Sequence, residues 1–135
     1  MKYSSIEDAK SPEIGPGQSS IWCLIANVMR EPHAEGPDGE TRLGTKRFAP
    51  GAKLYCFPPR WGDGGARLRV LGRHRGGGPR LIDAVVATKH LVNWRAQQVF
   101  HPHVIQAMRG YWDYSEKSER EAKELAEAFN GRLAH

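Results

Sequence analysis

The sequence predicts a mainly β fold with C-terminal α-helices, arranged as a small, strongly bent antiparallel sheet or an SH3-like barrel. Short strand-like runs separated by turn formers fill residues 20–100, and an amphipathic helical pattern follows them. A single helical or 3₁₀ turn before the last strand is the feature that resembles an SH3-like barrel. The chain has 135 residues, 39% of them hydrophobic. One domain over 20–135 is therefore expected, after a flexible N-terminal arm at 1–19 that is rich in Ser, Pro and charge.

The first strand is expected within the stretch SIWCLIANVMREP, because apolar residues fill both of its alternating faces. Such a strand is covered by protein on both sides. Pro32 ends it. The polar segment 33–42 is predicted to be a loop that reverses direction at residues 37–39, where the sequence is Pro-Asp-Gly.

The second strand, AKLYCF at 52–57, is enclosed by turn signals. Residues 49–51 (Ala-Pro-Gly) fit a type II turn in which Gly51 supplies the positive φ. Two prolines at 58–59 end the strand, and a glycine-flanked loop carries Arg60 and Trp61. Two interpretations of Trp61 stay open: an exposed aromatic at a loop tip, or a core residue that closes one end of the barrel.

The next two strands form a hairpin. Leu68 and Val70 are expected to point inward, and Arg67 and Arg69 outward. A reversal at 76–79 (GGGP) leads into the strand LIDAVV, and the stretch GRHRGGGPR at 72–80 is typical of a flexible basic hairpin tip. The segment ATKHLVNW predicts the short helical turn before a last strand, WRAQQVF.

Two helices are predicted after the strands. Pro102 suits the first turn of a short helix, PHVIQAM. In the C-terminal helix, Ser118 is expected to be the N-cap of a capping box, and Leu125 and Phe129 lie on an apolar face. Residues 130–131 (Asn-Gly) are expected to end this helix.

Charge is concentrated in the middle of the chain. Residues 42–95 hold twelve Lys or Arg against two Asp, a net charge of +10, whereas the whole chain carries +5. Such a field favours an anionic partner, either a nucleic acid or an acidic protein surface. The alternative is that outward strand positions carry long charged side chains only to protect sheet edges.

Residues with catalytic or metal-binding potential form no recognisable pattern. Cys23 and Cys56 lie in apolar runs and are expected to be buried reduced thiols. His101 and His103 flank a proline without a third ligand nearby, so structural or surface histidines are favoured. We expect no enzyme, no metal and no cofactor. Because the N-terminus lacks a signal-peptide pattern and no long apolar run exists, a cytoplasmic protein without membrane contact is expected.

Four stretches carry a resemblance to a known family: SIWCLIANV, GTKRFAPGAKLYCFPPRWGDG, VLGRHR and LVNWRAQQVFHPHVI. Together they resemble a family of uncharacterised small bacterial proteins that share the pattern GTKxFxPGAKxYCFPPxWGDG. The resemblance spans about residues 20–108 and implies a bacterial origin and an intact domain. It implies no activity.

Three functions follow from these features as hypotheses. The first is a non-catalytic inhibitor of the immunity or antitoxin type that covers a protein partner such as a toxin domain, because exposed aromatics and arginines are frequent at interface hot spots. The second is a small basic barrel that binds nucleic acid, and the third is an enzyme. The candidate binding residues are Arg60, Trp61, Arg67, Arg69, Arg73, Arg75 and Trp94.

Overall fold

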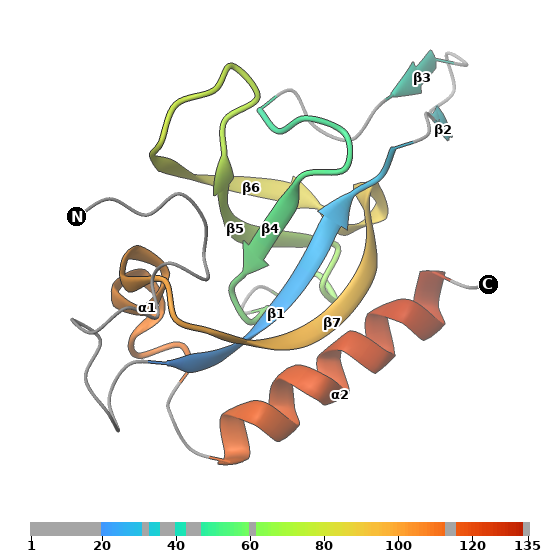
Figure 1. The fold of residues 1–135 in the computed structure, drawn as a ribbon. Coiled ribbons are helices and arrows are strands. Elements are labelled where there is room, and N and C mark those ends of the chain that lie inside the picture. Colours follow the sequence, from blue (N-terminus) through green and yellow to red (C-terminus); the bar gives the residue numbers. More distant parts are fainter. Residues whose placement is uncertain are drawn as a thin grey trace.

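Five strands form one antiparallel sheet in the order β6-β5-β4-β1-β7 (Figure 1). The computed structural model describes residues 20–30, 33–35, 40–42, 47–59, 62–112 and 116–133. The strands of the sheet are β1 (Ile21–Val28), β4 (Lys53–Cys56), β5 (Arg67–Arg73), β6 (Leu81–Ala87) and β7 (Leu91–Val99). The two helices are α1 (Pro102–Met108) and α2 (Glu116–Leu133). A separate two-stranded ribbon, β2 (His33–Glu35) and β3 (Glu40–Arg42), lies where a loop was expected.

The predicted fold class is confirmed in its bent-sheet form. The fold is mainly β, its five-stranded sheet is entirely antiparallel, and helices follow the sheet. The 3₁₀ turn Thr88–His90 precedes the last strand, as expected. Strands β6 and β7 stand at opposite ends of the order and do not pair with each other. The sheet is therefore open, and it has two edges.

A tight turn fixes where strand β4 begins. Ala52 N–H donates to Ala49 O at 3.0 Å, and Gly51 has a φ of 85°, as the predicted type II turn requires. Within β5, Gly72 leaves room for Phe48 and Leu54, because a Cβ at this position would lie 2.8 Å from Cε1 of Phe48 and still closer to Leu54. The segment before β4 thus packs into the face of β5.

Both faces of the interior strand β1 are covered, as the sequence predicted. Leu24 lies opposite Cys56 of β4 and Ala96 of β7, so these three share one face. Helix α2 lies along β7 and β1, where Phe129 stacks on Trp94 with ring centroids 4.3 Å apart (Figure 1). The opposite face is covered from α1, where Cys23 Sγ lies 3.5 Å from the sulfur of Met108.

Several predicted boundaries are wrong. Helix α2 begins at Glu116, so Ser118 lies buried inside it and is not its N-cap. It also continues past 130–131 to Leu133, because Asn130 uses its side chain to bind β7 and Gly131 has no positive φ.

Strand β7 begins at Leu91, three residues before the predicted start at Trp94. A β-bulge explains the difference. Ile25 lies opposite Arg95, but Asn27 lies opposite Val92, so β7 holds one extra residue, and Asn93 there has a φ of 63°. The bulge breaks the two-residue alternation that sequence reasoning uses to recognise a strand.

Candidate binding surface

The structure brings three of the predicted binding residues together on one strand. Arg67, Arg69 and Arg73 point to the same side of β5, where the buried Leu71 separates Arg73 from the other two, while Leu68 and Val70 are buried on the other side, as predicted. Arg75 follows in the exposed turn before β6. Arg60 and Trp61 lie outside the described residues.

Trp94 is placed elsewhere. Its side chain is 3% exposed and stacks on Phe129, and its backbone is bound by Asn130 of α2. Because no face of the indole is available to a partner in this arrangement, we leave Trp94 out of the candidate surface.

Arg69 is the most highly organised of the arginines. Its Nε and Nη2 atoms donate to the Asp83 carboxylate of β6, the shortest contact being 2.6 Å from Nη2 to Oδ2, and Nη1 donates to the Tyr111 hydroxyl at 3.1 Å. The guanidinium lies over the Phe57 ring, 4.2 Å from its centroid. The hydrogen bond to Asp83 is the main cause that raises the pKa of Arg69. The charge of Arg69 is therefore compensated within the protein, and its orientation is fixed.

Tyr111 reaches Arg69 from the segment after α1. The N–H of Tyr111 donates to Met108 O at 2.9 Å, and its ring meets Phe57 edge-on, with centroids 5.0 Å apart. The next residue, Trp112, is buried and donates from Nε1 to Cys56 O at 3.3 Å. These contacts hold Tyr111 at the surface with 38% of its area exposed.

Val85 adds an apolar side chain next to Arg69. The two residues lie directly opposite each other on β6 and β5, and Val85 is 50% exposed. An aromatic, an arginine and an aliphatic side chain thus adjoin on one rigid surface. We call this surface the β5–β6 outer face and define it by Arg67, Arg69, Asp83, Val85 and Tyr111.

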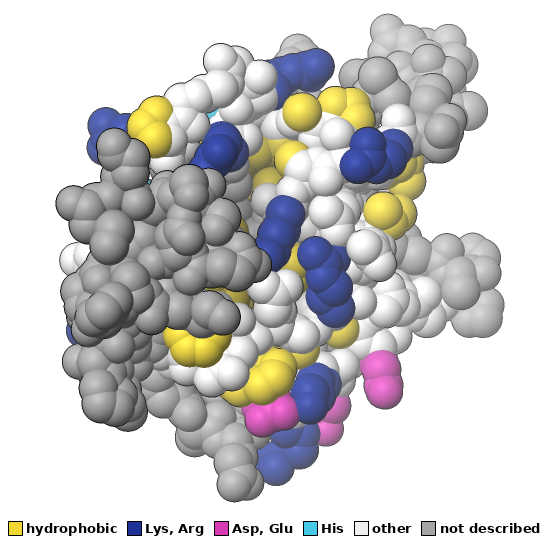
Figure 2. Space-filling view, in the orientation of Figure 1, with side chains coloured by type: hydrophobic (Ala, Val, Ile, Leu, Met, Phe, Trp, Pro, Cys, Tyr) yellow, Lys and Arg dark blue, Asp and Glu magenta, His cyan; other side chains and the backbone are white. Residues whose placement is uncertain are grey.

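The remaining predicted arginines are less constrained. Arg67 Nε lies 3.4 Å from Asp63 Oδ2, and its side chain is 63% exposed. Arg73 and Arg75 are exposed, and Arg75 is anchored through its backbone, which donates to Arg47 O at 2.7 Å. In Figure 2, Lys and Arg side chains are scattered over the visible face without merging into one patch, and acidic side chains gather over α2. On that face, the basic charge is spread out.

His101 has a structural role. His101 is the N-cap of α1, because its Nδ1 accepts a hydrogen bond from His103 N–H at 3.2 Å. Partial burial, with help from the nearby His103 and Arg73, lowers the pKa of His101 and favours this accepting form. Among the residues that the structure describes, no group of three or more His, Cys, Asp or Glu is arranged to hold a metal ion.

The two cysteines are buried and unbridged. Cys56 lies opposite Leu24 in the register, so Cys23 points to the other face of the sheet. Burial raises the pKa of both thiols, and a neutral thiol is a poor nucleophile. The predicted buried thiols are confirmed.

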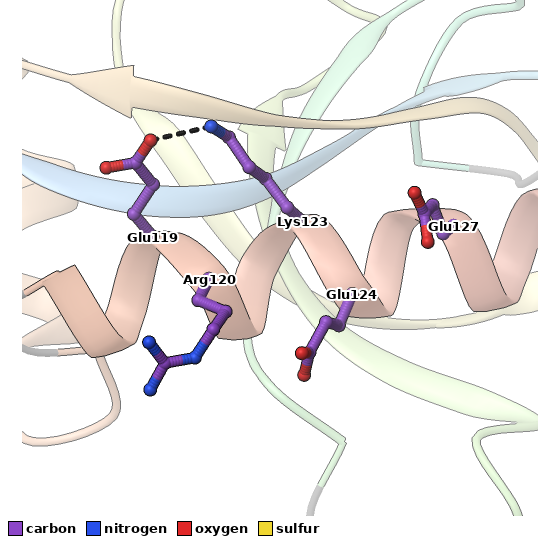
Figure 3. Close-up of a pocket in the computed structure, with 5 residues that line it drawn as sticks. All are labelled: Glu119, Arg120, Lys123, Glu124 and Glu127. Atoms are coloured by element: carbon purple, nitrogen blue, oxygen red, sulfur yellow. Dashed lines mark hydrogen bonds and ion pairs between the residues drawn. The ribbon is translucent and has the colours of Figure 1, made fainter.

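One surface hollow lies on α2 (Figure 3). All of its described lining side chains belong to this single helix, and Lys123 forms an ion pair with Glu119 at 2.6 Å across one helical turn. No other element that the structure describes contributes a wall. The hollow is a groove between solvated side chains, and we assign it no ligand.

Comparisons with family models, with curated proteins and with solved structures give no match. In the described part of the chain, no helix is both long and apolar enough to cross a membrane.

Sequence reasoning missed Val85, Asp83 and Tyr111. An alternating pattern would have placed Asp83 and Val85 on the same side as the arginines, because LIDAVV pairs directly with the arginine strand in a hairpin. Tyr111 had a weaker signal, a glycine followed by two aromatics after a short helix. The β5–β6 outer face comes from three separate segments, and that grouping depends on tertiary structure.

Proposed function

We propose that the protein acts by binding and not by catalysis, and that the β5–β6 outer face covers a protein partner. Such a protein is of the immunity or antitoxin type, an inhibitor that blocks a partner's working surface. The single observation that carries this proposal is the fixed, charge-compensated Arg69 between Tyr111 and Val85.

Protein interfaces favour this combination of side chains. Tyrosine and arginine are enriched at hot spots, and side chains held in place before binding lose less conformational entropy. Arg69 already uses its hydrogen-bonding edge on Asp83 and Tyr111, so it offers a partner mainly packing area and polarity. Arg69 could bind a phosphate only by breaking its hydrogen bonds to Asp83.

Charge restricts the kind of partner. The +10 segment repels a basic surface, including the nucleic-acid-binding face of a nuclease toxin, and it attracts an acidic one. The proposed partner therefore presents acidic groups around the contact. We place the encounter in the cytoplasm, in accord with the two reduced thiols.

Nucleic acid is the second candidate, and the turn between β5 and β6 favours it. Arg73, Arg75 and Arg80 are all exposed around this glycine-rich turn. Three such cations are suited to contacts with a phosphate backbone.

A site-specific photo-crosslinker tests the protein-partner proposal. Incorporated at Val85 and activated in cells of the source organism, it should give one discrete protein adduct that survives nuclease treatment. The same crosslinker at Glu124, on the solvated side of α2, is the matched control and should not give it. Replacing Tyr111 by Ala should remove the Val85 adduct.

Binding to labelled single- and double-stranded DNA and RNA tests the second candidate at about 50 and 200 mM salt. We expect only weak binding. Tight binding whose affinity falls steeply with salt, a Val85 adduct that nuclease removes, or no Val85 adduct at all would overturn the protein-partner proposal.

A further inference from the structure

Strand β6 forms one edge of the sheet, and the part of the chain that the structure describes places no further strand beside it. Its only strand partner among the described residues is β5, to which seven consecutive residue pairs join it without a register shift. Edge strands in natural proteins usually carry a bulge, a proline or an outward charge that prevents further pairing. Strand β6, all of which the structure describes, has no bulge and no proline, and its only charged side chain is Asp83.

The hydrogen-bond pattern identifies the backbone groups that face outward. Phe57 N–H donates to Arg69 O, so the backbone groups of Arg69 point to β4 and those of Leu68 and Val70 point to β6. Their opposite residues are Val86 and Ala84, which therefore point back to β5. The N–H and C=O groups of Asp83 and Val85 point away from the sheet, where no described residue accepts or donates.

The one charge on this edge is neutralised from within. Asp83 turns toward β5 and receives the Arg69 guanidinium, so it does not repel an incoming strand as a free carboxylate would. Next to it, Val85 offers a half-exposed β-branched side chain for cross-strand packing. The edge thus combines hydrogen-bonding groups that no described residue uses with an apolar surface.

Positive charges stand at both ends of the edge. Arg80 immediately precedes β6 and is exposed, and Lys89 follows it in the 3₁₀ turn and is also exposed. Arg67 and Arg73 lie on the neighbouring strand. A second copy of this chain would bring the same cations against these, whereas a strand with an acidic residue at each end would match them.

We propose that β6 binds an extended segment of the protein partner as an added strand, and that this segment is uncharged in its centre and acidic at both ends. This inference rests on the proposed function and specifies how the partner is recognised. Backbone hydrogen bonds to Asp83 and Val85 give affinity, and Arg80 and Lys89 select for the acidic ends. Seven residues of the partner, about 23 Å of strand, match the length of β6.

A synthetic peptide tests this mode with the whole purified chain. The probe is seven residues long, N-acetylated and C-amidated, and alternates Thr and Val between a Glu at each end. Amide resonances of Asp83 and Val85 should shift on titration. Their hydrogen exchange should slow about tenfold at nine-tenths occupancy, because only the free protein exchanges.

Two variants of Val85 separate the backbone from the side chain. V85P removes an N–H that the fold itself does not use, so the protein should stay folded while peptide affinity falls by at least about fivefold. V85A keeps the N–H and is the matched control, with a smaller loss. Circular dichroism and thermal melting check that both variants are folded. D83P is a second test and is compared with D83A, because both variants lose the carboxylate that holds Arg69 and only D83P loses the outward N–H.

Each other outcome counts against strand addition. The proposal fails if a peptide with Lys at both ends binds equally well, if the shifts lie away from β6, or if V85P binds as the wild type does. Concentration-dependent dimers in sedimentation that V85P abolishes would assign the edge to a second copy instead. If the crosslinker at Val85 still gives the same protein adduct in the D83P variant, the proposed function stands and only strand addition is rejected.

Discussion

The two edges of the sheet are treated in opposite ways. At the β7 edge, the N–H and C=O of Trp94 point outward, and the side chain of Asn130 bonds both, at 3.2 and 3.0 Å. An amide side chain from α2 thus takes the place of a neighbouring strand. At the β6 edge, the corresponding groups of Asp83 and Val85 have no described partner. Among the described residues, a helix protects one edge, and none pairs with the outward backbone groups of the other.

This contrast links stability to function within one fold. The protected edge coincides with the attachment of α2, where the Trp94–Phe129 stack and the Asn130 hydrogen bonds act on the same strand residue. The available edge adjoins the organised Arg69 and Tyr111. Substitutions at the first edge should therefore lower the free energy of unfolding, and substitutions at the second should affect binding.

The largest effect is expected from Phe129→Ala. This change removes a side chain that is 1% exposed and stacked on Trp94, so it should lower the free energy of unfolding by about 3–5 kcal/mol. Chemical denaturation measures the loss. Glu124→Ala on the solvated side of α2 is the control and should stay within about 0.5 kcal/mol of the wild type. A wild-type stability for Phe129→Ala would mean that α2 does not protect the β7 edge.

A smaller loss is expected from Asn130→Ala, about 0.5–1.5 kcal/mol, because two partly buried hydrogen bonds are removed. Hydrogen exchange of the Trp94 amide should become faster. In the matched variant Asn130→Asp, a carboxylate oxygen still accepts from Trp94 N–H, so this amide should stay slower than in the alanine variant. Equal exchange in all three proteins would show that Asn130 does not cap the edge.

The smallest effect on stability is expected from Val85→Lys. Val85 is half exposed, so the free energy of unfolding should change by no more than about 0.5 kcal/mol, although an added charge blocks the edge. In the wild-type protein, amide exchange along β6 should alternate, fast at Asp83 and Val85 and slow at Ala84 and Val86. Uniformly slow exchange would mean that the β6 edge is already paired, and the contrast between the edges would disappear.

The sequence predicted the strands with regular alternation well. The arginine side of β5, the turn at Gly51 and the 3₁₀ turn before β7 all follow from local rules that depend on a few neighbouring residues. The start of β7 was missed because Asn93 adds a residue and shifts the alternation. Asn130 was interpreted as a helix end, since its local signal is the same whether it ends a helix or binds a strand 36 residues away.

The candidate surface was predictable only in part. Its arginines were identified from their outward positions, but charge compensation by Asp83 and contact with Tyr111 connect segments 14 and 42 residues apart. Trp94 illustrates the reverse error. It was a candidate because exposed aromatics are frequent at interface hot spots, whereas its side chain is buried and stacks on Phe129 of α2.

Gly72 has a consequence for how this sequence can vary. Leu54 of β4 and Phe48, from the segment before it, together occupy the space that a side chain on Gly72 would need. Enlarging residue 72 alone overfills the core, at about 1–3 kcal/mol, and shrinking residue 48 alone leaves a cavity. An exchange of volume between residue 72 and the pair formed by residues 48 and 54 relieves both problems, so these three positions should co-vary among relatives of this chain, a signature that would identify the fold where overall identity is low.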